Sequence, residues 1–250
     1  MTTVQSTQGT VAVIHLVGPA DYQAYAKQLD AMHQLRYRVF KERLGWHVHA
    51  VDGRERDEFD DLDPLYLLAL DEDGEVVGSW RFLPTTGPYM LRDVFSQLLD
   101  GRPAPSDIGT WEGSRFAVER SRRRGSSLAS VSQVAGELLC SVVETCMAMG
   151  VRELITVYDQ RMARLLCRMG CPPRQQSNSH TIGQAIAMAG YFDMTNEVLD
   201  SIREATDRAV ARQPAGFSIE RGHARVRHHS NGALDARRQG QDDRRVPRLQ

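Results

Sequence analysis

The stretch from residue 65 to residue 83 constrains the fold most, because two apolar runs in it are joined by a tight-turn signal. Leu65–Leu70 and Val76–Leu83 are rich in residues that favour strands, and the Asp73-Gly74 pair between them is typical of a β-hairpin. Farther along the chain, short apolar runs alternate with segments of helical periodicity. A hairpin followed by alternating helices and strands predicts an α/β fold with a mixed central sheet, mostly antiparallel and then parallel, and helices on both faces.

The other expected elements follow from the same periodicities. Further strands are expected where short apolar runs occur, at Val11–Val17, Thr110–Val118 and Leu154–Tyr158. Helices are expected where apolar residues recur at helical spacing, from Asp21 to about residue 42 and at 90–99, 129–149, 160–169 and 196–212. Asp21 is the expected cap of the first helix. Residues 182–189 are apolar and fit either a strand or a helix.

Composition separates a globular part from a C-terminal tail. The chain is 41% hydrophobic and 25% charged, which is ordinary for a globular protein. We expect residues 1–213 to form a single domain and residues 214–250 to be a flexible, arginine-rich tail. A nucleic-acid or anionic-surface binder is a weaker alternative, because the tail also carries acids and lacks interleaved aromatic residues, and the net charge is only −1.

The cysteines and the N-terminus give no sign of export. The four cysteines form no CxxC pair and no metal-binding spacing, so free thiols in a reducing compartment are expected. The N-terminus lacks the pattern of a signal peptide, and we expect no apolar run to be long enough to cross a bilayer. We therefore expect a cytoplasmic protein without a membrane span, a nucleic-acid partner or a metal site.

The stretch from residue 52 to residue 63 is dense in carboxylates. It is expected to lie in a loop, 45–63, because it is too acidic and too poor in aliphatic residues for core. A loop of this length indicates a function. Asp57 and Asp60 are three residues apart, so one helical turn would aim both carboxylates at a cationic ligand or at fixed arginines. A solvated acidic loop is the structural alternative.

Arginines next to aromatic residues mark further candidate sites. Arg36 and Phe40 are four residues apart and share a helix face, although a helix end with a surface arginine is the simpler explanation. Arg81 points to the opposite strand face from Trp80 and Phe82, so it needs a carboxylate partner if it is buried. The alternative is an edge-strand arginine that faces water.

The strand at 110–118 carries a third group of polar residues. Glu112 and Ser114 share one strand face, and Arg115 takes the other face unless a bulge re-aims it. A glutamate on a central strand is uncommon as structure alone.

In order along the chain, these residues resemble the acyl-homoserine-lactone (autoinducer) synthases of bacterial quorum sensing. The resemblance covers about residues 12–205 and is carried by Arg36, Phe40, Trp46, Asp57, Asp60, Arg81, Phe95, Glu112 and Arg115. The stretches Arg-Leu-Gly-Trp at 43–46, Gly-Ser-Trp-Arg at 78–81 and Ser-Arg-Phe at 114–116 add to it, as does the stretch at 83–91. The pattern departs at Gly113, where the family often has a larger apolar residue.

The resemblance implies an acetyltransferase-like three-layer sandwich and a two-step reaction. An acyl donor, acyl-acyl-carrier-protein or acyl-CoA, acylates the amine of S-adenosylmethionine. The methionine carboxylate then closes the lactone, and methylthioadenosine leaves. No cofactor is implied, since S-adenosylmethionine is a substrate and phosphopantetheine arrives with the donor. The alternative is an acyl-CoA-dependent N-acyltransferase acting on another amine.

Roles for individual residues follow from the resemblance and from this chemistry. Glu112 is the first choice for the base that takes the amine proton. Asp57 and Asp60 are expected to pair with Arg36, Arg81 or Arg115, and Arg36 is also suited to a substrate carboxylate. The expected substrate-binding residues are Phe40 and Trp46 beside the adenosine or sulfonium, Thr156 beside an oxygen at carbon three, and Phe95, Ser114 and Phe116.

The expected entrance for the acyl donor is an arginine-rich segment that precedes the long helix. It contains Arg122, Arg123, Arg124 and Gly125, and it partly resembles the loop that holds pyrophosphate in acyl-CoA transferases. A solvated loop is the alternative.

Overall fold

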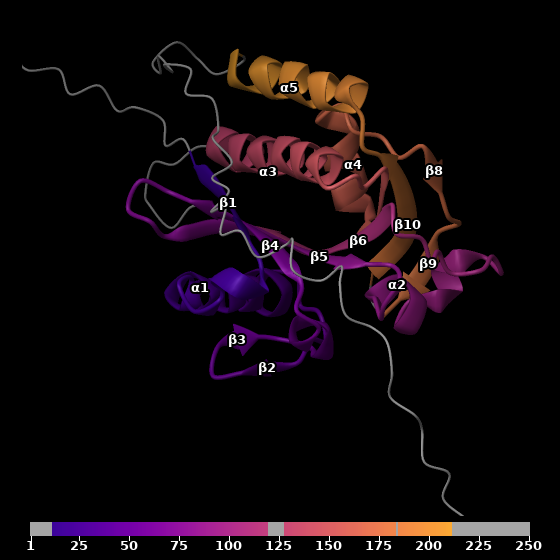
Figure 1. The fold of residues 1–250 in the computed structure, drawn as a ribbon, viewed down its shortest axis with the longest axis horizontal. Coiled ribbons are helices and arrows are strands. Elements are labelled where there is room, and N and C mark those ends of the chain that lie inside the picture. The colour runs from indigo at the N-terminus through magenta and orange to yellow at the C-terminus, as the bar shows by residue number, and fades with distance from the viewer. Residues whose placement is uncertain (1–11, 120–127, 184, 212–250) are drawn as a thin grey trace, which may run out of the picture.

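The computed structural model describes residues 12–119, 128–183 and 185–211, and a central eight-stranded sheet organises them. The strands lie in the order β1-β4-β5-β6-β7-β10-β8, and β9 also pairs with β10 (Figure 1). Their bounds are β1 Val13–Val17, β4 Leu65–Leu70, β5 Val76–Pro84, β6 Thr110–Val118, β7 Glu153–Asp159, β8 Gln175–Gln176, β9 His180–Ile182 and β10 Ala185–Asp193. A separate two-stranded hairpin joins β2 (Ala50–Val51) to β3 (Arg54–Glu55).

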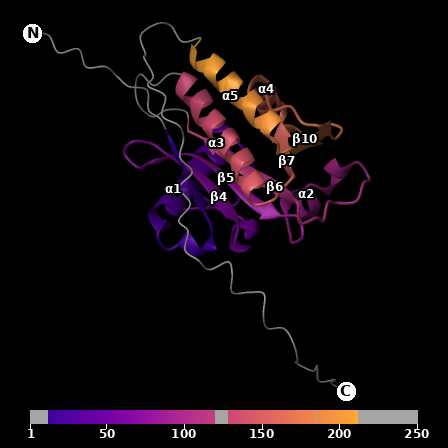
Figure 2. The ribbon, with the colours of Figure 1, turned by 45° about the horizontal axis from the view of Figure 1, so that its top comes forward.

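Helices cover both faces of the sheet, which confirms the expected three-layer arrangement. Helices α3 (Leu128–Ala148), α4 (Gln160–Arg168) and α5 (Asn196–Ala211) pack on one face, and α1 (Ala26–Arg36) and α2 (Met90–Asp93) pack on the other. In Figure 1, α3 and α5 run above the sheet while α1 and the β2–β3 hairpin lie below it. Figure 2 shows α5 lying along α3.

Strand pairing confirms a mixed sheet that is mostly antiparallel. From β1 through β6 each neighbouring pair is antiparallel, whereas β6 and β7 are parallel and are joined through the crossover helix α3. The β6–β7 pairing runs from Thr110↔Glu153 to Gly113↔Thr156, although both strands continue beyond it. The two strands therefore part after Gly113 and Thr156, and the sheet opens there.

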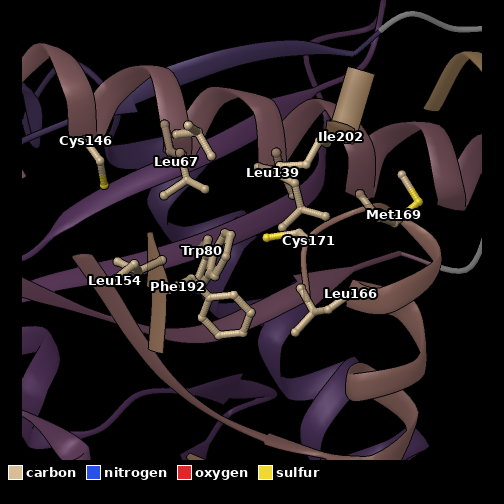
Figure 3. Packing of buried hydrophobic residues seen from close by; sticks show 14 of the residues in the cluster. Leu67, Trp80, Leu139, Cys146, Leu154, Leu166, Met169, Cys171, Phe192 and Ile202 are labelled. Atoms are coloured by element: carbon tan, nitrogen blue, oxygen red, sulfur yellow. The ribbon is translucent and has the colours of Figure 1, made fainter. Parts of the chain in front are cut away.

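Side-chain alternation along β5 sends different residues into the two layers. Trp80 and Phe82 join the large cluster between the sheet and α3, whereas Arg81 and Leu83 face the α1 and α2 side. This is the alternation expected for Arg81. Figure 3 shows Trp80 in the middle of the larger cluster, with Leu139 of α3 above it.

Helix α3 has the length and composition of a membrane span, which the sequence analysis did not anticipate. Its window Val131–Ala148 has a mean hydropathy of 1.2. The expectation that no apolar run reaches this length is therefore wrong. However, 56% of the window is buried, and Leu138, Leu139 and Val143 contact the sheet cluster. This is the environment of a core helix.

Two further expectations need correction, and one open alternative is resolved. The first helix is not capped by Asp21: Pro19–Asp21 is a short 3₁₀ turn, α1 begins at Ala26, and a π-helical segment, η2 (Tyr37–Arg43), continues it. The helix expected at 90–99 is two short pieces, α2 and the 3₁₀ turn η4 (Ser96–Leu99). The apolar segment at 182–189, which fits either a strand or a helix by sequence, is strand at Ile182, in β9, and from Ala185 onward, in β10.

The acidic stretch is ordered and partly buried, so the expectation that it is too acidic for the interior is wrong. It begins in the turn of the β2–β3 hairpin, includes β3 and contains a 3₁₀ turn, η3 (Glu58–Asp61). Glu55 is 0% exposed and Asp60 is 5% exposed. Burial is possible because arginines from α1, β5 and β6 meet these carboxylates.

Candidate active site

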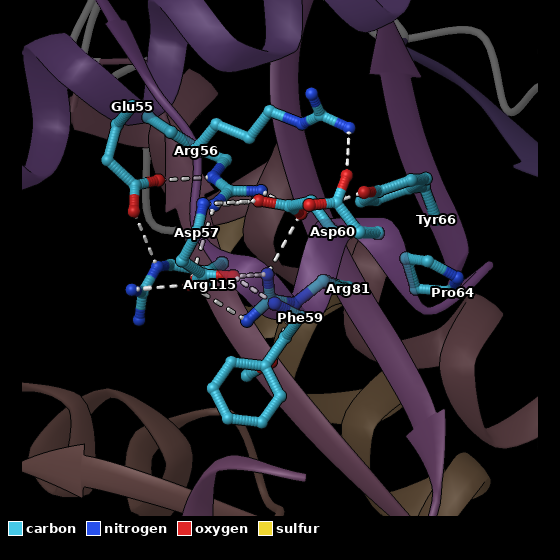
Figure 4. A network of polar contacts seen from close by, with 12 residues as sticks. Glu55, Arg56, Asp57, Phe59, Asp60, Pro64, Tyr66, Arg81 and Arg115 are labelled. Atoms are coloured by element: carbon cyan, nitrogen blue, oxygen red, sulfur yellow. Dashed lines mark hydrogen bonds and ion pairs between the residues drawn. The ribbon is translucent and has the colours of Figure 1, made fainter. Parts of the chain in front are cut away.

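A buried cluster of six alternating charges lies between α1, the acidic stretch and strands β5 and β6 (Figure 4). Its guanidiniums belong to Arg36, Arg81 and Arg115, and its carboxylates belong to Glu55, Asp57 and Asp60. Three positive and three negative groups balance, so the cluster carries no formal excess of charge.

Arg36 is the most enclosed member of the cluster. Its Nη1 and Nη2 atoms donate to the two carboxylate oxygens of Asp60 at 2.7 and 2.9 Å, and its Nε donates to Glu55 Oε2 at 2.5 Å. The side chain is fully buried. Since these acids occupy its fork, Arg36 joins α1 to the acidic stretch and does not face an open surface.

Local structure in η3 aims the two aspartates as their spacing predicts. Asp57 caps the turn through Phe59 N, and Asp60 Oδ2 accepts a hydrogen bond from the Asp57 backbone N–H at 2.9 Å. Tyr66 of β4 donates its hydroxyl to Asp60 Oδ1 at 2.8 Å. Both carboxylates are therefore fixed before any ligand binds.

Arg81 connects the cluster to β6 and α2. Its Nη1 lies 2.5 Å from Asp57 Oδ1 and 2.9 Å from Asp60 Oδ1, and its Nε donates to Ser114 Oγ at 3.1 Å. Its Nη2 contacts the sulfur of Met90 at 3.2 Å. The partner carboxylates that a buried strand arginine requires are thus present.

A β-bulge turns Arg115 toward the cluster. The β5–β6 register shifts between Ser79 and Arg81, and Arg115 adopts a left-handed conformation with φ 58°. Its Nε then reaches Glu55 Oε1 at 2.9 Å, and its Nη2 reaches Asp57 Oδ2 at 2.6 Å. With 12% of its side chain exposed, Arg115 is the least buried arginine of the three.

The mutual fields of the cluster keep its groups ionised. Burial alone would raise the pKa of Asp60, but the positive charges of Arg36 and Arg81 outweigh it and hold that pKa well below its ordinary value. Burial works against the charge of Arg36, but Asp60 and Glu55 raise its pKa above the ordinary range. Burial, together with the neighbouring charge of Asp60, raises the pKa of Tyr66, so its phenol stays protonated as a donor.

Glu112 lies next to the cluster and has a different environment. It is 1% exposed, and its two carboxylate oxygens accept hydrogen bonds from the backbone N–H groups of Met90 and Leu91 at 2.9 and 2.6 Å. Burial raises the pKa of Glu112 to about 7, although these hydrogen bonds and the charges of Arg81 and Arg115 oppose the rise. A carboxyl group with a pKa near 7 is suited to proton transfer at neutral pH.

Phe40 and Trp46 form a stacked pair beside Arg115. Their ring centroids are 5.2 Å apart at 18°, and the Arg115 guanidinium lies 5.6 Å from the centre of the Phe40 ring. Phe40 is buried between these two groups, whereas Trp46 is partly exposed. Trp46 therefore offers the accessible aromatic surface at this site.

The remaining candidates lie in different parts of the fold. Ser114 joins the cluster through Arg81, but Phe95 packs in the α2 cluster and Phe116 packs edge-on against Trp80 on the opposite sheet face. Thr156 is buried on β7 at the point where β6 and β7 part. The expected entrance at Arg122–Gly125 lies outside the described residues.

Sequence reasoning missed three members of the site. Glu55 lies in the acidic stretch and was assigned no role of its own, although it joins Arg36 to Arg115. Met90 contacts both Arg81 and Arg115 through its sulfur, and Tyr66 donates to Asp60. The surplus of acids was the available signal for Glu55, whereas a methionine and a tyrosine in apolar segments are typical of ordinary core.

Comparisons with known proteins identify the family of this chain. Residues 21–202 match the autoinducer synthase family. The acyl-homoserine-lactone synthase of Agrobacterium fabrum is 40% identical over 176 residues, which cover 70% of this chain and 82% of that protein. The structure of the AHL synthase LasI has a TM-score of 0.68 at 28% identity and covers 86% of this chain and 100% of that chain.

A second solved structure was determined with ligands. BjaI, a CoA-dependent acyl-homoserine lactone synthase solved with SAM and isopentyl-CoA, has a TM-score of 0.68 at 30% identity. The match covers 84% of this chain and 94% of that chain. Fold, site and relatives together define an enzyme of the acyltransferase class. The chain belongs to the autoinducer synthase family, the acyl-homoserine-lactone synthases.

Proposed function

We propose that this chain acylates the amine of S-adenosylmethionine with a thioester-bound acyl group and then closes the lactone. In the first step the amine nitrogen attacks the thioester carbonyl, an amide forms, the thiol leaves, and a base takes the amine proton. In the second step the methionine carboxylate attacks the carbon next to the sulfonium. Methylthioadenosine then leaves with the electrons of the broken C–S bond.

The observation that carries this proposal is the environment of Glu112. A buried carboxyl group with a pKa of about 7 lies beside Arg81 and Arg115 and on the strand that parts from β7. The strand and the α2 backbone fix its position. Glu112 is thus suited to accept the amine proton, and the nearby fixed charges favour the positioning that both steps need.

Arg115 and Trp46 are the best candidates for contacts to S-adenosylmethionine. Arg115 is the least buried arginine of the cluster, and its guanidinium matches a carboxylate. The partly exposed face of Trp46 suits the sulfonium or the adenine. Arg36 is fully enclosed by Glu55 and Asp60, so we assign it to positioning the acidic stretch. BjaI, solved with SAM and with MTA, supports this substrate class.

We propose that the acyl group arrives on an acyl carrier protein, because helix α4 presents a row of exposed arginines. Arg161, Arg164 and Arg168 recur at helical spacing and are exposed, and none forms an ion pair within the described ranges 12–119, 128–183 and 185–211. Helix α4 begins directly after the C-terminal end of β7, where β7 is no longer paired with β6. A basic stripe beside this opening fits an acidic protein surface.

Product analysis tests the reaction itself. The purified chain is incubated with S-adenosylmethionine labelled in the methionine carbons and with acyl-carrier-protein and acyl-CoA donors of several lengths. A labelled acyl-homoserine lactone and an equal amount of methylthioadenosine are expected. If no labelled lactone forms with any donor while another amine is acylated, the chain is a plain N-acyltransferase instead.

Charge reversal on α4 tests the donor. Arg164→Glu together with Arg168→Glu is expected to raise KM for acyl-carrier-protein roughly tenfold and to leave KM for acyl-CoA unchanged. Arg203→Glu, an exposed arginine of α5 that pairs with Glu144, is the matched control. Equal KM values in the double variant and the control would remove α4 as the docking helix.

Two coarser expectations complete the proposal. The free thiols of Cys140, Cys146, Cys167 and Cys171 suit a reducing compartment, and we propose the cytoplasm. Both chemical steps are balanced without a metal or redox group, so we propose that the enzyme uses no cofactor. Retained turnover after exhaustive dialysis against a chelator is the expected result.

A further inference from the structure

The indole N–H of Trp80 is a buried donor without a partner. Trp80 is 3% exposed, and its Nε1 atom has no hydrogen-bond acceptor among the described residues. Three other buried polar atoms in the same ranges share this state, the hydroxyls of Ser79, Ser141 and Thr145. A hydroxyl hydrogen rotates, whereas the indole N–H is fixed in the ring plane and can only donate. A buried donor left unmatched is unfavourable, so its position needs an explanation.

The N–H end of this ring lies directly over Gly113. A Cβ atom at Gly113 would lie 2.9 Å from Trp80 Nε1, a distance that no real side chain tolerates without a shift. Glycine at this position therefore lets the indole nitrogen lie against the β6 backbone. This also gives a physical reason for the departure from the family pattern at residue 113.

Gly113 is the last residue of β6 that pairs with β7. Its partner is Thr156, and the partner of Thr156 on β10 is Gly190. These three residues are neighbours in a row across three strands, and the Trp80 ring lies against Gly113 while the Tyr158 ring lies against Gly190. The row begins where the sheet opens, and apolar residues such as Leu154 and Phe192 surround it.

The side chains of Trp80 and Glu112 lie on opposite faces of the sheet. Glu112 binds the backbone of α2, whereas Trp80 belongs to the cluster under α3. An acyl group whose reacting carbon lies near Glu112 must pass between the parted strands before its tail reaches Trp80. The oxygen that accepts the indole N–H is therefore a substituent on the acyl chain of the substrate and is not the reacting carbonyl oxygen.

We propose that Trp80 is a specificity-determining residue that donates its indole N–H to an oxygen substituent on the acyl chain of the donor. This inference rests on the proposed function, because it names the class of acyl group that the same site takes. An oxo or hydroxy oxygen would satisfy the donor, whereas an unsubstituted chain would leave it unmatched in an apolar environment. The hydroxyl of Thr156 lies on the same face, in the strand next to Gly113.

Nuclear magnetic resonance of the indole N–H groups tests this contact without turnover. The chain contains three tryptophans, so a nitrogen-15-labelled sample gives three indole signals. Trp46→Phe and Trp111→Phe assign the Trp80 signal by elimination. We expect 3-oxo-acyl homoserine lactones, from hexanoyl to dodecanoyl, to move it downfield, and the unsubstituted lactones to leave it in place. A Trp80 signal that stays fixed while the same lactone shifts other resonances would overturn the proposal, and would indicate a weak contact with the Phe116 ring instead.

Kinetics of one substitution separate this inference from the proposed function. Trp80→Phe keeps an aromatic ring and removes the donor, so kcat/KM for 3-oxo donors is expected to fall roughly tenfold while unsubstituted donors change less than about twofold. Trp111→Phe, on the same sheet face, is the matched control and keeps the wild-type preference. Lactone formation with an unchanged preference in Trp80→Phe would overturn the inference alone. If the wild-type protein forms no lactone with any donor, the proposed function itself is overturned.

Discussion

The carboxylate of Asp60 lies flat against the guanidinium of Arg36, with contacts of 2.7 and 2.9 Å, and both side chains are almost completely buried. This pair joins the acidic stretch to α1. Because neither group reaches water, removing one of them leaves the other charged and unsolvated. The pair is therefore expected to contribute strongly to the stability of the whole charged cluster.

Asp60→Asn is expected to lower the free energy of unfolding by about 3–5 kcal/mol, because Arg36 and Arg81 lose a buried counter-charge. The neighbouring substitution Asp61→Asn is the control, since the Asp61–Arg56 pair is more than half exposed and is expected to contribute less than about 1 kcal/mol. Urea unfolding of the three proteins measures both values. Similar losses in the two variants would contradict the buried-pair account.

The dependence of stability on pH has opposite signs for two carboxyl groups. The lowered pKa of Asp60 gives stability that is complete above its unfolded pKa of about 4 and is lost as the pH falls below it. The raised pKa of Glu112, about 7, makes the folded state bind more protons than the unfolded state between about pH 4.5 and pH 7. The free energy of unfolding should therefore fall as pH rises through that window.

Urea unfolding at a series of pH values, with wild type and Glu112→Gln, checks this sign. The variant is expected to lose the decline between about pH 4.5 and pH 7 and to keep the loss below about pH 4. An unchanged slope in Glu112→Gln would show that Glu112 does not carry the raised pKa.

Gly113→Ala is expected to destabilise the fold by about 1–3 kcal/mol, because its methyl group meets the Trp80 indole at 2.9 Å in a packed cluster. Gly87→Ala is the control: a Cβ there meets nothing within 4 Å. Thermal unfolding of both variants gives the comparison. Equal melting temperatures would mean that the indole moves aside at little cost.

Removal of residues 214–250 is expected to leave lactone synthesis within about twofold of the full chain, because that stretch has the composition of a tail and lies beyond the family match at 21–202. Steady-state rates of the two proteins decide this. Complete loss of activity in a folded truncated protein would assign the tail to the site.

Patterns with a strong local cause were predictable from sequence. The hairpin at Asp73 and Gly74 forms as expected, with Gly74 at φ 76°, and the alternation along β5 correctly placed Arg81 opposite Trp80. The three-residue spacing of Asp57 and Asp60 was enough to predict that both carboxylates point toward the arginines, because one short turn sets the direction of both. These features depend on residues near one another in the chain.

Features with a long-range cause were not predictable in the same way. Burial of Glu55 depends on Arg36 and Arg115, which are 19 and 60 residues away. The expectation that this stretch is too acidic for the interior failed, because composition does not show that arginines from three other elements neutralise the acids. The position of Phe116 depends on the bulge at Arg115, whose register shift the sequence did not reveal.

The most direct test of the account is the pH dependence of amide formation in wild type and in Glu112→Gln. With a Glu112 pKa of about 7, kcat/KM of the wild type should rise about tenfold per pH unit below pH 7 and level off above it. The glutamine variant should lose about 10²–10⁴-fold in kcat while it binds S-adenosylmethionine nearly as well. A glutamine variant that turns over at the wild-type rate, with the same profile, would contradict the assignment of Glu112 as the base.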